Sequence, residues 1–127
     1  MTEKNIVQTE KAPTPIGPYS MGVAIGNLIF TAGQLGIDPK SGEIVAGGIQ
    51  AETRQALTNI KNILEAAGSR LENVVKTTVY LRDMADFGQM NAVYGEFFPQ
   101  NYPARTTVQA AALPKNAAVE IEAIAFR

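Results

Sequence analysis

The sequence predicts an α+β sandwich in which two helices cover one face of a mainly antiparallel sheet. Two segments carry apolar residues at helical spacing, and short β-rich runs stand before, between and after them. A doubly wound α/β fold would need a helix between most strands, and this order does not supply one. Apolar residues make up 46% of the 127 residues, as in globular proteins. We therefore expect one α+β domain over residues 1–127.

The first part of the chain predicts short strands and turns. Three prolines in residues 12–18 predict a stiff, extended arm. Residues 23–32 are interpreted as two strands around a tight turn at residues 26–27, a Gly-Asn pair. Residues 38–42 (DPKSG) predict a further turn, followed by a brief strand over residues 43–45.

Two helices are expected in the middle of the chain. Residues 50–67 have the clearest amphipathic pattern, and Gly68 can terminate that helix. A buried strand over residues 74–81 follows. Asp83 or Asp86 can cap the second helix. Its stripe of large side chains is interpreted as core rather than as a cofactor-binding surface and consists of Phe87, Met90, Tyr94 and Phe97.

The last two strands are predicted over residues 105–112 and 119–126. Residues 113–118 are too few for a crossover helix, so we expect the two strands to be antiparallel neighbours. Alternation places Glu120 and Glu122 on one face of the last strand, and Arg105 and Thr107 on one face of the strand before it.

Absent residue types exclude several kinds of site. With no cysteine and no histidine, the chain has no thiolate nucleophile, no Ser-His-Asp triad and no metal site built from either residue. We also expect no metal site built from oxygen ligands, because no EF-hand-like spacing occurs. Catalysis would depend on carboxylates, Arg, Lys, Tyr, hydroxyls or backbone groups. The formal net charge is −1 and no two basic residues are adjacent, which argues against a nucleic-acid partner.

The N-terminal sequence gives an expectation about location. Residues 1–13 are polar and of mixed charge, unlike a signal peptide. No apolar run approaches the roughly 18 residues of a membrane span. We therefore expect a cytoplasmic protein with no membrane partner.

Charged groups on the last strands are the candidate site residues. A carboxylate of Glu120 or Glu122 needs a partner if that face is covered, because an isolated buried charge is costly; otherwise the strand end is solvated. The Arg105 guanidinium can bind a substrate carboxylate through two hydrogen bonds, or it can form a structural salt bridge with either glutamate. The proline-rich arm can hold Tyr19 in a fixed place.

Four segments together point to a family. They are residues 12–19 (APTPIGPY), 30–34 (FTAGQ), 75–80 (VKTTVY) and 103–124 (PARTTVQAAALPKNAAVEIEAI). They resemble the reactive intermediate deaminases, the Rid or YjgF-like imine deaminases. The resemblance implies a chorismate-mutase-like fold and a homotrimer with clefts between subunits. It also implies cofactor-free hydrolysis of 2-aminoacrylate/2-iminopropanoate and 2-iminobutanoate to 2-keto acids and ammonia, a form of metabolite damage control.

The resemblance assigns roles to five residues. Arg105 holds the substrate carboxylate, and Glu120 orients or activates the attacking water. Tyr19 lines the pocket and bonds the imine end or the water. Gly33 offers its backbone to the substrate, and Asn91 matches a polar pocket position.

Three further positions complete the expected site. Glu122 receives no role from the resemblance, and we assign it to the structure of the sheet. Thr107 stands where family members commonly carry a cysteine, and Ala32 where a serine is frequent. Both are retained as candidate substrate contacts, and these departures affect the expected substrate preference more than the reaction class.

Two other functions are considered. A non-enzymatic or regulatory trimer can use the same arginine cleft to bind small carboxylates. An endoribonuclease, the activity attributed to some relatives, is the weakest hypothesis, because the chain has no histidine and no basic cluster.

Overall fold

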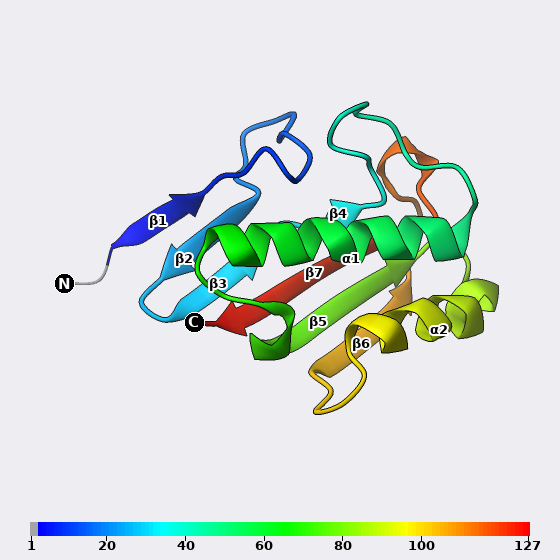
Figure 1. The fold of residues 1–127 in the computed structure, drawn as a ribbon. Coiled ribbons are helices and arrows are strands. Elements are labelled where there is room, and N and C mark those ends of the chain that lie inside the picture. The colour runs from blue at the N-terminus through cyan, green and yellow to red at the C-terminus, as the bar shows by residue number, and fades with distance from the viewer. Residues whose placement is uncertain (1–2) are drawn as a thin grey trace.

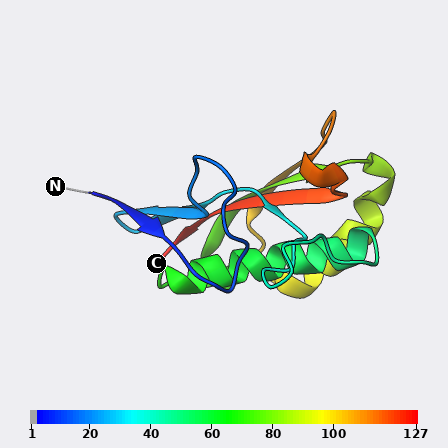
Figure 2. The same cartoon turned by 90° about the horizontal axis from the view of Figure 1, so that it is seen from above.

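The computed structural model describes residues 3–127 and confirms the α+β class. In Figures 1 and 2, both helices lie on one side of a twisted sheet. The helices are α1 (Ile49–Ala66) and α2 (Phe87–Phe97). The strands are β1 (Lys4–Val7), β2 (Gly22–Ile25), β3 (Leu28–Thr31), β4 (Gln34–Leu35), β5 (Val74–Leu81), β6 (Ala104–Gln109) and β7 (Val119–Phe126).

The sheet has the order β1-β2-β3-β7-β5-β6, and β4 pairs with the remaining part of β7. Every pairing is antiparallel except that of β5 with β6, which are parallel and joined through α2. The prediction that β6 and β7 are neighbours is therefore wrong, because β5 lies between them. The link over residues 113–118 has to pass only the end of β5, which separates β6 from β7 by about 10 Å. Six extended residues reach about 20 Å, so the link is long enough.

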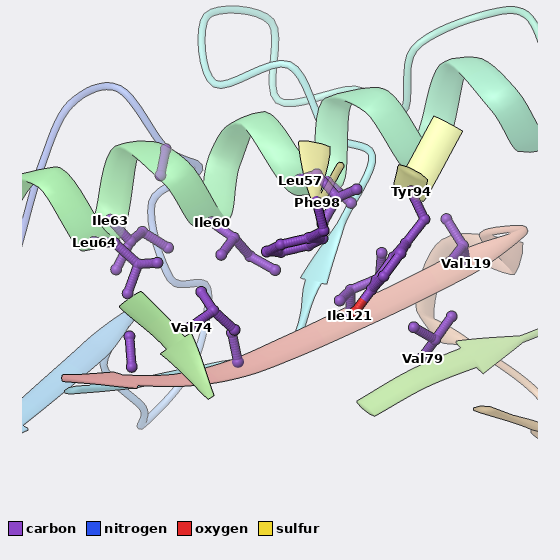
Figure 3. Packing of buried hydrophobic residues seen from close by; sticks show 14 of the residues in the cluster. Leu57, Ile60, Ile63, Leu64, Val74, Val79, Tyr94, Phe98, Val119 and Ile121 are labelled. Carbon is purple, nitrogen blue, oxygen red and sulfur yellow. The ribbon is translucent and has the colours of Figure 1, made fainter. Parts of the chain in front are cut away.

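The main core lies between α1 and the sheet. Leu57, Ile60, Ile63 and Leu64 point from the helix toward β7 and β5, and all four are fully buried. They meet Val79 and Ile121, which alternate with exposed or half-buried residues along their strands (Figure 3). The predicted helix and the two predicted strands that form this core are confirmed to within about a residue at each end.

The second helix contributes core residues, as its stripe predicts. Met90 and Tyr94 are buried, and the Tyr94 ring lies against the ring of Phe98, with centroids 4.8 Å apart. Phe87 and Phe97 are partly buried at the edge of the same cluster.

Several local expectations differ in detail. The predicted strand over residues 43–45 is reduced to one bridge, between Ile37 and Ile44. The Asp83 side chain accepts a hydrogen bond from the Ala85 N–H in the short 3₁₀ turn before α2, whereas Asp86 takes the N-cap position without a side-chain bond. Strand β6 ends at Gln109, three residues before its predicted end. The sequence analysis predicts neither strand β1 nor strand β4.

The sheet face opposite the helices carries exposed apolar side chains. They come from most strands, since register puts Ile25 and Leu28 beside Phe126, and Val108 beside Tyr80. The large apolar residues on this face that remain substantially exposed are Ile6, Ile25, Leu28, Phe30, Val108 and Phe126. Exposed apolar surface of this extent is typical of an interaction face. Within residues 3–127, no helix is both long enough and apolar enough to cross a membrane.

Candidate active site

Glu120 stands in the wall of a cavity of about 680 Å³. It is the second residue of β7, and its register partners are Leu35 on one side and Tyr80 on the other. The proline-rich arm brings Tyr19 to the same cavity, and the segment between β3 and β4 brings Ala32 and Gly33. These four predicted site residues, Tyr19, Ala32, Gly33 and Glu120, are hereafter called the acid half-site.

Glycine is required at position 33 because the Glu120 carboxylate lies directly against its Cα. A Cβ built on Gly33 would overlap Oε2 of Glu120, and it would also crowd the Cδ and Cγ atoms of that side chain. The absence of a side chain at residue 33 therefore lets the Glu120 carboxylate pack directly against the backbone, which holds it in place.

The surroundings of Glu120 favour its protonated form more than those of an ordinary glutamate. Burial raises the pKa of this carboxyl, and the negative charge of Glu122, two residues along the same face, raises the pKa further. A carboxylate with a raised pKa is a stronger base once it is ionised, which suits it to accept a proton from water.

Arg105 occupies a different environment, beneath α2. Its guanidinium carbon lies 4.7 Å from the centroid of the Tyr94 ring and 5.5 Å from that of Phe87, so two aromatic faces support the cation. The Tyr94 hydroxyl is 2.7 Å from Oγ1 of Thr77, and this hydrogen bond fixes the ring. Burial raises the pKa of Tyr94, although the Thr77 bond and the Arg105 charge oppose that rise.

In the described part of the chain, Arg105 has no salt-bridge partner, and two predicted site residues near it have buried polar atoms without a hydrogen-bond partner. Among residues 3–127, the only salt bridge joins Arg54 to Glu96, so no carboxylate of the described chain pairs with Arg105. Oδ1 of Asn91 and Oγ1 of Thr107 are buried with no hydrogen-bond partner. Buried polar atoms are almost always paired in native proteins, so unpaired ones at a predicted site indicate a missing partner. Asn91, Arg105 and Thr107, with the supporting Tyr94 ring, are hereafter called the arginine half-site.

The two half-sites face opposite sides of the sheet. Arg105 is in register with Thr77 of β5, which is in register with Ala123 of β7, and both of those residues are buried beneath the helices. Glu120 lies three residues from Ala123 and therefore points to the other face. The alternative of a structural salt bridge between Arg105 and Glu120 or Glu122 is thus wrong within one chain.

Sequence reasoning missed the aromatic support for Arg105. Tyr94 and Phe87 belong to the stripe that helical spacing assigns to the core, and Tyr94 is indeed buried. Helical spacing identifies the buried face of α2, but only the pairing of β5 with β6 places an arginine beneath it. Within the part of the chain that the structure describes, no three acidic side chains gather in a way that could hold a metal ion.

Comparison with known proteins identifies the family. The family model described as Endoribonuclease L-PSP matches residues 9–127. A RutC family protein of Pyrococcus horikoshii is 56% identical over 124 residues, which are 98% of each chain. A protein of Bos taurus named 2-iminobutanoate/2-iminopropanoate deaminase is 53% identical over 98% of this chain and 90% of its own length.

The fold agrees with these matches. The crystal structure of E. coli TdcF with bound serine superimposes with a TM-score of 0.93 at 44% identity, over 97% of this chain and 98% of that one. By sequence over almost its whole length and by fold, the chain belongs to the Endoribonuclease L-PSP family, the Rid or YjgF-like proteins that its motifs resemble.

Proposed function

We propose that the protein hydrolyses small 2-imino acids, among them 2-iminobutanoate and 2-iminopropanoate, to 2-keto acids and ammonia. The observation that carries the proposal is the arginine half-site, where a supported guanidinium and two buried polar atoms have no partner. A substrate carboxylate would satisfy the guanidinium with two hydrogen bonds. Relatives named as deaminases of these two imino acids support the reaction class.

In the proposed reaction, Arg105 holds the carboxylate and so fixes the C=N bond against the acid half-site. Ionised Glu120 accepts a proton as the oxygen of a water molecule adds to C2, and the imine nitrogen takes up a proton from solvent. Protonated Glu120 then passes its proton to the amine of the resulting carbinolamine. Ammonia leaves as the C–N bond breaks, and the hydroxyl group loses its proton to solvent and becomes the carbonyl of the keto acid. Tyr19 and the backbone of Gly33 line the side on which the water and the nitrogen lie.

This mechanism requires two copies of the chain, because the two half-sites face opposite sides of one sheet. We infer a homotrimer in which Arg105 of one subunit and Glu120 of the next meet in a shared cleft. The apolar sheet face opposite the helices supports this assembly, since it needs a cover. A closed ring is the usual result when two different surfaces of one chain bind each other.

The direct test generates the substrate in the assay. An amino-acid oxidase converts 2-aminobutyrate to 2-iminobutanoate, and semicarbazide traps the imine as a chromophore. We expect the protein to suppress the trapped product in proportion to its concentration. Absence of suppression by a folded oligomer, with imino acids of several chain lengths, would contradict the proposal. Binding of 2-oxobutanoate without suppression would favour the carboxylate sensor, and cleavage of RNA would favour the nuclease.

Gly33→Ala is expected to lower imine hydrolysis by about 10²-fold, since a misplacement of about 1 Å at a reacting group has an effect of that size. The added Cβ must displace the Glu120 carboxylate. Steady-state kinetics measures the loss, and thermal unfolding checks that the fold survives. Gly88→Ala is the matched control, because a Cβ there meets nothing within 4 Å. Equal activity of the two variants would show that the close contact has no role.

Glu122→Gln is expected to move the acid limb of the kcat/KM profile to lower pH. The negative charge of Glu122 raises the pKa of Glu120, so its removal lets Glu120 ionise, and act as a base, in more acidic solution. The pH dependence of kcat/KM measures this. Glu65→Gln, on the exposed face of α1, is the control and should leave the limb in place. A limb that stays fixed in Glu122→Gln would mean that Glu120 is not the titrating base.

A further inference from the structure

The cavity of the acid half-site extends well beyond the residues that the proposed reaction uses. From Leu35, beside Glu120, the chain forms one wall through Ile37 and Pro39 and reaches Lys40. The opposite turn contributes Pro114 and Lys115 to the same cavity. The wall is thus apolar next to the carboxylate and cationic farther along. At about 680 Å³ in the single chain, the cavity falls in the range of small-molecule sites.

The turn that carries Lys115 is held in an unfavourable backbone conformation. Lys115 and Asn116 are consecutive non-glycine residues with φ of 57° and 54°. The Asn116 carbonyl accepts a 2.6 Å hydrogen bond from Nη1 of Arg82, which keeps the turn in place. Such strain persists only where the surrounding structure enforces it, and it clusters at functional sites. Nζ of Lys115 lies 3.5 Å from the carbonyl oxygen of Gly42, in the turn that also carries Lys40.

The two ammonium groups have no anionic partner. Among residues 3–127, neither Lys40 nor Lys115 forms a salt bridge. The acid nearest in sequence, Asp38, accepts the backbone N–H of Lys40 at 2.8 Å and does not line the cavity. Glu120 is the only acidic residue in the cavity wall. Lys40 and Lys115 are exposed residues that line the cavity, so the cavity presents two positive charges to a ligand that enters it.

We propose that the part of the cavity lined by Lys40 and Lys115 binds the terminal carboxylate of imino acids that carry one, so that the substrates include 2-imino dicarboxylic acids. The inference rests on the proposed function, which supplies the other contacts. Arg105 of the neighbouring copy holds the first carboxylate, Glu120 serves the C=N carbon, and the apolar wall contacts the methylene groups. Lys40 and Lys115 hold the second carboxylate, as unpaired ammonium groups in a pocket suit an anion.

The test compares two stable keto acids of equal length. 2-Oxoglutarate has the second carboxylate, and 2-oxopentanoate has a methyl group in its place. Calorimetric titration of the intact oligomer at low salt is expected to give about tenfold tighter binding of 2-oxoglutarate, with the preference falling as salt is added. Lys40→Met/Lys115→Met should remove that preference and leave 2-oxopentanoate binding within about twofold. Lys40→Arg/Lys115→Arg should keep the preference, and Lys61→Met, on the exposed face of α1, is the matched control.

The outcomes separate this inference from the proposed function. Equal binding of the two keto acids, or a preference that survives the double methionine substitution, would overturn the inference even if 2-iminobutanoate is hydrolysed. A lysine-dependent preference without hydrolysis of any imine would support the binding site and overturn the deaminase proposal. If both the inference and the proposed function hold, the imine formed from glutamate should be hydrolysed with a higher kcat/KM than the imine formed from norvaline. Only the glutamate-derived imine should be hydrolysed less efficiently by the double methionine variant.

Discussion

Glu120→Gln is expected to lower kcat for 2-iminobutanoate by about 10²–10⁴-fold, the usual contribution of a general base. Glutamine fills the same volume beside Gly33 but accepts no proton from water. Arg105 itself is unchanged, and in the proposed assembly it reaches the shared cleft from the neighbouring subunit, because it lies on the other face of its own sheet. The substitution therefore leaves the carboxylate-binding group in place. Binding of 2-oxobutanoate, measured by calorimetry, should therefore stay close to that of the unchanged protein while turnover, measured by semicarbazide trapping, is lost.

The comparison with Glu122→Gln makes this result specific. Both residues lie on the same face of β7, and both substitutions remove one negative charge. Only Glu120 lines the cavity and contacts Gly33. If the two variants lost turnover to the same extent, the loss would reflect the charge of the sheet face rather than a base at position 120. If neither lost turnover, the carboxylate sensor would become the leading hypothesis.

Local patterns predicted individual elements well where one face is buried. β5 and β7 are buried on the helix side, so their β-rich and alternating sequences gave their bounds, and α1 followed from its apolar stripe. β1 could not be predicted in this way. Three of its four residues are exposed, and it lies at the edge of the sheet, so no alternation of apolar and polar residues marks it.

The neighbours of a strand depend on the rest of the chain. The length of the link before β7 limits the distance between β6 and β7. It does not show that β5 pairs with β6 on the side facing β7 and so separates the two strands. The same holds for the site. Alternation correctly predicts which residues share a face within each strand, Glu120 with Glu122 and Arg105 with Thr107. It does not predict that Glu120 and Arg105 lie on opposite faces of the sheet, which follows from the registers of both strands with β5. Lys40 and Lys115 lie in turns, where no periodicity indicates a shared cavity.

Arg105→Ala is expected to lower kcat/KM for 2-iminobutanoate by about 10²-fold or more, since truncating one partner of a buried charge pair costs about 2–5 kcal/mol. The loss removes the two-point contact with the carboxylate, so 2-oxobutanoate binding should fall as well, in contrast to Glu120→Gln. Arg105→Lys keeps the charge but not the planar fork and should recover only part of the loss. Retention of 2-oxobutanoate binding in Arg105→Ala would show that the carboxylate binds elsewhere.

Mixing the two inactive variants tests the shared cleft most sharply. In equal amounts of Arg105→Ala and Glu120→Gln chains, half of the chains have the intact arginine and the other half have the intact glutamate. If each site combines Arg105 of one subunit with Glu120 of its neighbour, random assembly makes about a quarter of the sites complete. Co-refolded protein should then recover about a quarter of the normal turnover, although each variant alone is inactive. If one chain supplied both residues, every site would lack one of them, and the mixture would stay as inactive as its parts.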